Sequence, residues 1–337
     1  MYTSLEDRQI RQYIDAEQTR RVWLNAEQRA VNYRGSMYWK TVKDRDYLVR
    51  EYSKGRAKSL GPRSAETEKI LEDFKTGKAD AIHRLKGLRY AIHTHVRVNS
   101  ALRLGRTPNI VVGLLEEIRK AGLQDHFLVI GTNALYAYET QAGVRFDGDV
   151  TATTDVDILL DSRKQVTLVT DGDDHFRSYG LIGLLKKVDS SFEPQKDQEY
   201  RASNSRGYVV DLIQRRPGSL SDDKEKQQLI SNPDDFWATR IRNMDWLLRS
   251  PKFKQMVVGT NGTMAEMITV DPRAFVFYKF WLSQKEDRNP INKPRDLAQA
   301  KAVFELVEDR FPQINFEQIQ VFPESLLDEN AMSILKY

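Results

Sequence analysis

The sequence predicts an α+β protein in which a mixed β-sheet with flanking helices lies between helical N-terminal and C-terminal regions. Short apolar runs typical of buried strands occur at residues 127–130, 155–160 and 207–213. Long segments with helical spacing precede and follow these runs. Asn261-Gly262, between two strand-like segments, predicts a hairpin. We therefore divide the chain into a basic helical region (1–105), an α/β domain (106–272) and a helical region (273–337).

The composition bounds the classes of function. A chain of 337 residues has room for more than one domain. The absence of cysteine excludes disulfides, thiolate metal sites and cysteine nucleophiles. We find no signal-peptide pattern and no apolar run near the roughly eighteen residues that a membrane span needs. We therefore expect a cytoplasmic protein.

Charge is distributed unevenly along the chain. Lys and Arg outnumber Asp and Glu in residues 1–105, whereas acidic residues are in excess in the remainder. Within 36–63, aromatic residues alternate with basic ones: Tyr38, Trp39, Tyr47 and Tyr52 among Lys40, Lys43, Arg45, Arg50, Lys54, Arg56, Lys58 and Arg63. Rings stack on bases and cations pair with phosphates, so this region suits a nucleic acid. The alternative is a set of core rings and solvated basic side chains.

The N-terminal half is expected to hold three helices. They cover residues 4–34, 65–104 and about 109–121, and the last ends at Gly122 as a C-cap. Gly55 and Gly61-Pro62 indicate loops between the first two.

The central stretch reads as strand, glycine turn, helix and strand. Gly131-Thr132 follows the run at 127–130, and a turn of this kind before a helix aims backbone N–H groups at one point, which suits a phosphate. Asp155 and Asp157 lie two apart on the next strand and so face the same side. Two carboxylates on one face repel unless a cation lies between them. The pair therefore predicts a Mg²⁺ site.

A third carboxylate lies on a later strand. We expect a strand at 165–170, a helix at 176–187, a strand or loop at 200–205, and a buried strand at 207–213 that carries Asp211. An isolated aspartate in an apolar strand costs free energy unless it is satisfied, and a salt bridge alone would explain it. Together with Asp155 and Asp157, however, it completes the set of carboxylates used in two-metal phosphoryl transfer.

The C-terminal third is expected to hold a helix within 236–247, the hairpin arms 255–260 and 263–270, and two further helices. Asp271-Pro272 supplies an N-cap and a first-turn proline for the helix 273–285. Lys279 lies among its aromatic residues, where a lysine either reaches solvent or meets an anion. The last long helix begins near Arg295-Asp296.

These motifs resemble the nucleotidyltransferase superfamily that includes DNA polymerase β and small antibiotic-modifying transferases. Its signature is a Gly-Ser or Gly-Gly turn opening a helix, an Asp-x-Asp strand and a third carboxylate, matched by Gly131-Thr132, Asp155-Val156-Asp157 and Asp211. The segment GTNALYAYETQAGVRF resembles a bacterial branch bordering the abortive-infection type II (AbiEii) toxins. Those toxins also carry a lysine and a later Arg-Asp, as at Lys279 and Arg295-Asp296. Thr132 departs from the usual Ser or Gly, but its hydroxyl can still cap the helix or touch a phosphate.

The resemblance implies a nucleotidyltransferase-type sheet and a set of site residues. Asp155, Asp157 and Asp211 would be catalytic and would bind Mg²⁺ or Mn²⁺, and the nucleoside triphosphate (NTP) would be contacted by Gly131, Thr132, Asn133, Thr154, Lys279, Arg295 and Asp296. Asp296 would hold either Arg295 or Lys279 in place.

The resemblance and the basic N-terminal region favour RNA as the acceptor, in particular a tRNA-like RNA. A protein hydroxyl and a small hydroxylated compound are alternatives. A different class of function is a catalytically silent nucleotide- or nucleic-acid-binding module, or one half of a toxin–antitoxin pair with an antitoxin or other protein partner.

Overall fold

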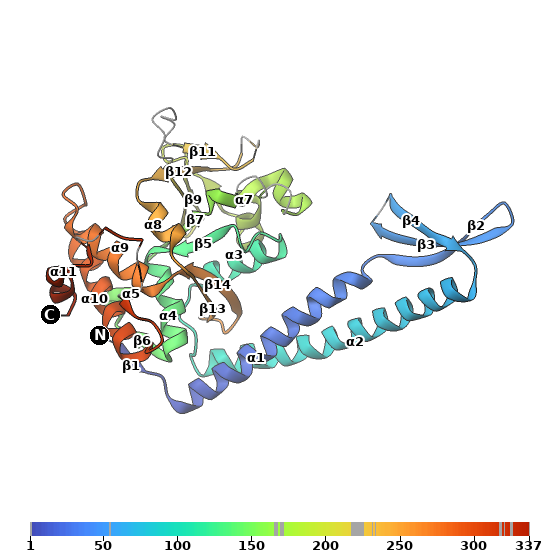
Figure 1. Cartoon of the computed structure of the whole chain (residues 1–337), viewed down its shortest axis with the longest axis horizontal. Helices are drawn as coiled ribbons and strands as arrows, with labels where there is room; N and C mark the ends of the chain where they lie inside the picture. Colours follow the sequence, from blue (N-terminus) through green and yellow to red (C-terminus); the bar gives the residue numbers. More distant parts are fainter. Residues whose placement is uncertain are drawn as a thin grey trace. The chain divides into compact units, whose positions relative to one another are not determined.

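The computed structural model describes residues 2–336 except 54, 165–167, 169–171, 217–225, 231, 233, 317–318, 320 and 324–325. The chain forms two compact units (Figure 1). One comprises residues 1–10 with 103–337, and the other comprises residues 11–102. Among the described residues, no helix is both long and apolar enough to cross a membrane.

The unit of residues 11–102 is a helical hairpin with a small sheet. Helices α1 (Asp7–Ala30) and α2 (Ala65–Ala101) flank a 3-10 turn, η1 (Val31–Tyr33), and the antiparallel strands β2 (Ser36–Val42), β3 (Arg45–Ser53) and β4 (Arg56–Pro62). Helix α2 begins as predicted, because Ser64 and Thr67 form a reciprocal capping box. The helices predicted at 4–34 and 65–104 are thus confirmed as α1 and α2.

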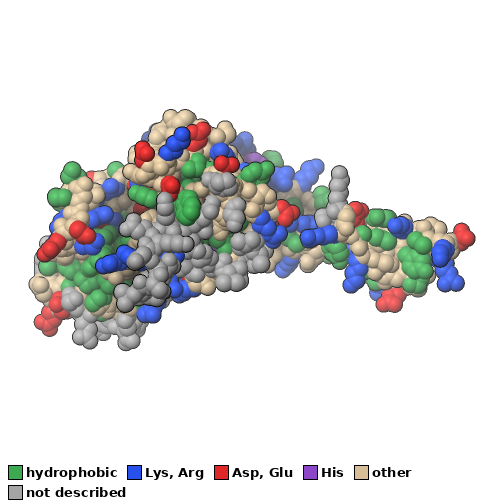
Figure 2. All heavy atoms as spheres, turned by 90° about the horizontal axis from the view of Figure 1, so that it is seen from above, with side chains coloured by type: hydrophobic (Ala, Val, Ile, Leu, Met, Phe, Trp, Pro, Cys, Tyr) green, Lys and Arg blue, Asp and Glu red, His purple; other side chains and the backbone are tan. Residues whose placement is uncertain are grey.

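The three-stranded sheet was not predicted: residues 36–62 were expected to be loops and a mixed surface segment. Burial alternates over the first five residues of β2, and the β2–β3 turn uses Lys43 and Asp44, both at positive φ. Without Asn-Gly, this two-residue turn gave no strong hairpin signal. Arg50 is buried, with its guanidinium carbon 4.0 Å from the centroid of the Phe74 ring. Tyr38 and Tyr52 are exposed. Figure 2 shows hydrophobic and basic side chains interspersed on the surface of this unit.

The larger unit contains the mixed sheet that the sequence predicts. Its strand order is β11-β12-β10-β7-β5-β14-β13, and β9 also pairs with β10 and β8. Strand β10 is parallel to β7 and β12, while β5 is antiparallel to β7 and parallel to β14. The strands are β5 (Phe127–Ile130), β7 (Asp155–Leu160), β8 (Glu193–Pro194), β9 (Arg201–Ser203), β10 (Val209–Arg215), β11 (Lys226–Gln228), β12 (Trp237–Ile241), β13 (Lys252–Val258) and β14 (Met264–Val270). A separate pair joins β1 (Tyr2–Ser4) to β6 (Val144–Phe146).

The helices of this unit largely match the predicted ones. They are α3 (Asn109–Lys120), α4 (Leu135–Ala142), α5 (Gly148–Thr151), α7 (Asp174–Val188), α8 (Met244–Arg249), α9 (Pro272–Gln284), α10 (Asn292–Arg310) and α11 (Glu329–Lys336), with 3-10 turns η2 (Gly131–Ala134) and η3 (Ser162–Lys164). The hairpin β13–β14 and the Asp271 cap of α9 are also confirmed.

Two expectations outside the site need comment. The helix predicted within 236–247 is wrong for Trp237–Ile241, which form β12; only Met244–Arg249 are helical. This segment is a strand because it pairs with β10 and β11, and its local apolar pattern does not reveal that pairing. The strand predicted at 165–170 lies almost entirely outside the described residues.

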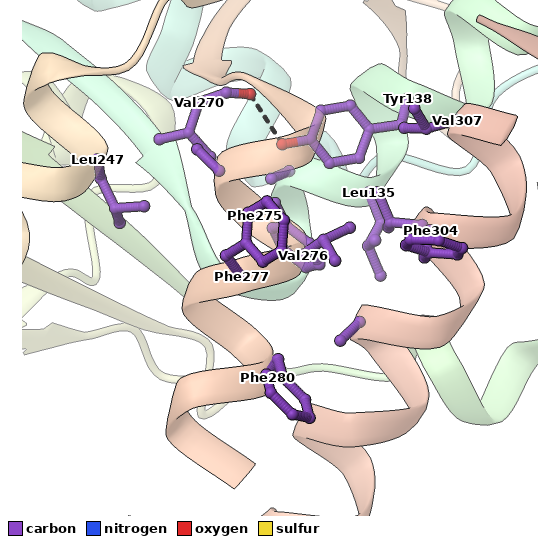
Figure 3. Close-up of a cluster of buried hydrophobic side chains, with 14 of the residues drawn as sticks. Leu135, Tyr138, Leu247, Val270, Phe275, Val276, Phe277, Phe280, Phe304 and Val307 are labelled. Atoms are coloured by element: carbon purple, nitrogen blue, oxygen red, sulfur yellow. Dashed lines mark hydrogen bonds between the residues drawn. The ribbon is translucent and has the colours of Figure 1, made fainter. Parts of the chain in front are cut away.

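Side chains from the two faces of the sheet enter two hydrophobic cores. Alternate residues of each strand divide between them, so that Leu159 and Ile213 join the core formed with α9 and α10, and Ile158 and Leu212 join the other. Figure 3 shows the first core, where the Tyr138 hydroxyl donates to the Val270 carbonyl at 2.8 Å. Asp157 and Asp211 lie two residues before Leu159 and Ile213. They therefore belong to the face covered by α9 and α10.

Candidate active site

A row of charged side chains crosses three neighbouring strands. Asp157 of β7 is in register with Asp211 of β10, and Asp211 is in register with Arg201 of β9. Residues directly opposite each other on paired strands project from the same face. Asp155, two residues before Asp157, shares that face. The sheet therefore brings together the carboxylates that the sequence singled out.

Asp157 lies where negative charge accumulates. Its partial burial, followed by the neighbouring Asp155 and Asp211 carboxylates, raises its pKa to about 7, although the charges of Lys279 and Arg201 oppose this. Gly131 allows the turn to approach this carboxylate. Its φ is +66°, and a Cβ there would lie 2.4 Å from Asp157 Oδ2.

Asp211 is held differently. Its Oδ1 accepts from Arg201 Nε and its Oδ2 from Arg201 Nη2, both at 2.7 Å. The carboxylate is buried, and the hydrogen bond to it raises the pKa of the Arg201 guanidinium. This bidentate pair uses both carboxylate oxygens.

The chemistry of the donors fits one divalent cation at Asp155 and Asp157. Mg²⁺ in proteins is commonly bound by one or two carboxylates, completed by water and substrate phosphates. Within the described part of the chain, no group of three or more His, Asp or Glu residues is arranged to hold a metal ion by itself. Burial is the main cause of the raised pKa of Asp157, and the Asp155 carboxylate adds to it. A cation between these two carboxylates would relieve their repulsion.

Helix α10 fixes the glycine turn. The Thr132 hydroxyl accepts from Gln299 Nε2 at 3.1 Å and from Arg295 Nη2 at 3.4 Å. Arg295 also donates to the Ala152 carbonyl, and Gln299 donates to the Val150 carbonyl at 2.8 Å. The predicted site residues Thr132 and Arg295 are therefore in contact.

Asn133 and Thr154 contribute through the backbone at the start of β7. Asn133 Nδ2 donates to the Asp155 carbonyl at 2.6 Å, and the Thr154 carbonyl accepts from Val209 N at 3.0 Å. The Thr153 hydroxyl donates to Asp155 Oδ1. These contacts position β7 and its two carboxylates.

Lys279 meets an anion inside the protein. Its Nζ lies 2.7 Å from Asp296 Oδ1, and Arg288 Nε lies 2.8 Å from Asp296 Oδ2. Burial lowers the pKa of Lys279, while Asp296 opposes that shift. Of the two partners considered for Asp296, the structure therefore pairs it with Lys279.

A pocket of about 840 Å³ adjoins these groups. Gly131, Asp157 and Lys279 line it together with apolar side chains such as Phe275 and Trp281. Among the described residues that line the pocket, two are acidic, Asp157 and Asp287, and six are basic: Arg216, Arg240, Arg242, Lys279, Lys285 and Arg288. The volume suits a small organic ligand, and the charge favours an anion.

Sequence reasoning missed Arg201, Arg288 and Gln299. Arg201 could have been found from the turn at Gly207, whose φ is +78°, because a hairpin there places Arg201 opposite Asp211. Arg288 and Gln299 gave no such signal, since their roles depend on how α9 and α10 pack.

A family model described as a nucleotidyltransferase matches residues 109–320, which is more than half of the chain. The chain belongs to the nucleotidyltransferase family. The match covers the carboxylate row, the glycine turn and the pocket, and it supports transfer of a nucleotidyl group as the general kind of activity. The unit of residues 11–102 lies outside the matched range. Searches of curated proteins and of solved structures found no match to the chain.

Proposed function

We propose that this nucleotidyltransferase uses a divalent metal ion to move a nucleoside monophosphate from an NTP onto an acceptor hydroxyl. The acceptor oxygen forms a bond to the α-phosphorus, the bond from that phosphorus to the bridging oxygen breaks, and pyrophosphate leaves with the electron pair. The acceptor proton passes to a base. The observation that carries this proposal is the carboxylate row beside Gly131, which adjoins a pocket rich in basic side chains.

The residues have distinct roles in this proposal. Asp155 and Asp157 would hold Mg²⁺ or Mn²⁺, which when bound neutralises triphosphate charge and polarises the α-phosphate. Backbone N–H groups of the turn at Gly131, Thr132 and Asn133 would bind phosphate oxygens. Lys279 would add positive charge, with Asp296 holding its ammonium in place and Arg295 fixing the turn.

RNA, and a tRNA-like end in particular, is the acceptor that we favour. The unit of residues 11–102 lies outside the family match, so it is a natural place for acceptor recognition. It carries basic residues and the exposed rings of Tyr38 and Tyr52. Exposed rings stack on bases and cations pair with phosphates, which is how proteins bind single-stranded nucleic acid.

Transfer of label tests the function. Purified protein would be incubated with each α-³²P-labelled NTP, Mg²⁺ or Mn²⁺, and total cell RNA with lysate protein. Label should enter a tRNA-sized band with wild type, and Asp155→Ala or Asp157→Ala should lower transfer by at least about a hundredfold, as expected when metal ligands are lost. Asp174→Ala, at a fully exposed carboxylate on α7, is the matched control.

Other outcomes separate the alternatives. Label in a protein band would indicate a protein-modifying enzyme. Metal-dependent NTP binding without transfer to RNA or protein would indicate a small-molecule acceptor or a silent module. Near-wild-type transfer by either aspartate variant would contradict the proposal. If RNA is the acceptor, its affinity should fall steeply as salt rises.

A further inference from the structure

We propose that Arg201 replaces a second metal ion in this site, so that the protein binds a single divalent cation, at Asp155 and Asp157. Arg201 is then a positioning residue that holds Asp211 and supplies a fixed positive charge. This inference rests on the proposed function, since it concerns the same site.

The geometry of Asp211 is the first support. Both of its oxygens accept hydrogen bonds of 2.7 Å from one guanidinium. A carboxylate engaged in this way has one lone pair of each oxygen occupied by the guanidinium, so less of it is available to a cation next to Asp157. An arginine remains charged at any working pH, so the pair does not loosen by loss of a proton.

The backbone around Arg201 is the second support. The short β9 strand pairs with β10, with Arg201 directly opposite Asp211. Arg201 N donates to the Gln198 carbonyl at 2.8 Å, and Leu212 N donates to the Tyr200 carbonyl at 2.9 Å. These backbone bonds lie on either side of the ion pair, so the local pairing of β9 with β10 holds the guanidinium beside Asp211.

Burial is the third support. The Asp211 side chain is 9% exposed and that of Arg201 is 27% exposed. A metal ion that displaced Arg201 would have to offset the loss of two charge-assisted hydrogen bonds to a buried carboxylate. One at Asp155 and Asp157 relieves a repulsion already present.

The division of charge along the row follows from these contacts. Asp211 has its countercharge built into the protein, and Asp157 faces two neighbouring carboxylates. A cation at Asp155 and Asp157 and the Arg201 guanidinium then compensate the negative charge at the two ends of the row.

Counting bound metal tests the inference. Mn²⁺ would be titrated into the full chain with a non-hydrolysable α,β-methylene NTP, and bound ions per chain would be measured by electron paramagnetic resonance and calorimetry. Wild type should bind one Mn²⁺, and Asp211→Asn should still bind one. Arg201→Gln, which frees Asp211, should bind two. Arg201→Lys would show whether another cation at this position also excludes the second ion, and one bound ion is expected.

Arg206→Gln is the matched control, because it removes another arginine–aspartate pair, with Asp189 at 2.8 Å, beside the same two strands. It should bind one ion. Circular dichroism would confirm that each variant is folded. If Arg201→Gln does not fold, the number of ions bound by wild type is compared with the number bound by Asp211→Asn. Two ions in wild type and one in Asp211→Asn would overturn the inference.

The outcomes distinguish this inference from the proposed function. Two ions in wild type, or one in both wild type and a folded Arg201→Gln, would overturn the role of Arg201 and leave nucleotidyl transfer standing. No Mn²⁺ binding and no NTP binding in wild type would overturn the proposed function and this inference with it.

Discussion

Two clusters of charge lie close to the same pocket and are built in opposite ways. Between α9 and α10, Lys279 and Arg288 both pair with Asp296, which is 2% exposed. On the sheet, burial and the neighbouring Asp155 and Asp211 carboxylates raise the pKa of Asp157 to about 7. The first cluster pairs opposite charges, whereas in the second the Asp155 and Asp157 carboxylates lie beside each other.

The difference separates a contact that maintains the fold from one that prepares a site. A paired buried charge is compensated within the protein, so its place in the fold does not depend on a ligand. Like charges held together raise the free energy of the folded protein, and such groups concentrate at functional sites. The contrast supports the placement of the metal at the carboxylates and of Lys279 as a fixed positive charge.

The largest expected effect on stability is at Asp296. Asp296→Ala should lower the free energy of unfolding by about 3–5 kcal/mol, because it leaves Lys279 charged and buried without its carboxylate. Urea denaturation at pH 7 would measure this. A loss below about 1 kcal/mol would mean that the pair is not the structural element described above.

Asp157→Asn should have the opposite sign in metal-free protein. The folded pKa of about 7 exceeds the ordinary value of 3.8, so folding favours the protonated carboxyl, and this contribution is present below about pH 4 and lost as pH rises through 7. The amide resembles the protonated form. At pH 8 the variant should therefore be more stable than wild type by about 1–3 kcal/mol.

Denaturation at pH 8 and near pH 4 would check this, with the difference vanishing at the lower pH. Added Mg²⁺ and NTP should stabilise wild type and leave the variant unchanged. A variant less stable than wild type at pH 8 would show that Asp157 is a structural carboxylate like Asp296.

A smaller effect is expected at the glycine turn. Gly131→Ala places a methyl group 2.4 Å from Asp157 Oδ2 at a φ of +66°. Gly207→Ala is the matched control, because its φ is +78° and nothing lies within 4 Å of the added carbon. Both should lose about 1–2 kcal/mol of stability from the backbone alone. Only Gly131→Ala should also weaken Mn²⁺ binding, and equal Mn²⁺ affinity in the two variants would contradict a close approach to the carboxylate.

The smallest effect should be at Lys285 and Asp287, whose side chains are 40% and 71% exposed and lie 2.8 Å apart. Asp287→Ala should leave the free energy of unfolding nearly unchanged, because an exposed ion pair contributes little to stability. It serves as the exposed counterpart of Asp296→Ala in the same denaturation series. If Asp287→Ala lost as much stability as Asp296→Ala, burial would not be what determines how strongly such an ion pair stabilises the fold.

The sequence by itself determined the features that depend on near neighbours. Strand β7 with Asp155 and Asp157, the turn at Gly131, the hairpin at Asn261-Gly262 and the capped start of α9 all follow from alternation, backbone conformation and capping over a few residues. The resemblance to nucleotidyltransferases rested in part on the turn at Gly131 and on Asp155 and Asp157, and the family match supports the superfamily.

The tertiary structure alone decided which distant groups meet. It placed Arg201 on both oxygens of Asp211. It also paired Asp296 with Lys279 and not with Arg295, and it made Trp237–Ile241 a strand. Each outcome depends on register between strands or on the packing of two helices, and the free energy of such a contact depends on burial that no short window of sequence contains. The residue types were visible in the chain, but their partners were fixed only when the sheet and its covering helices came together.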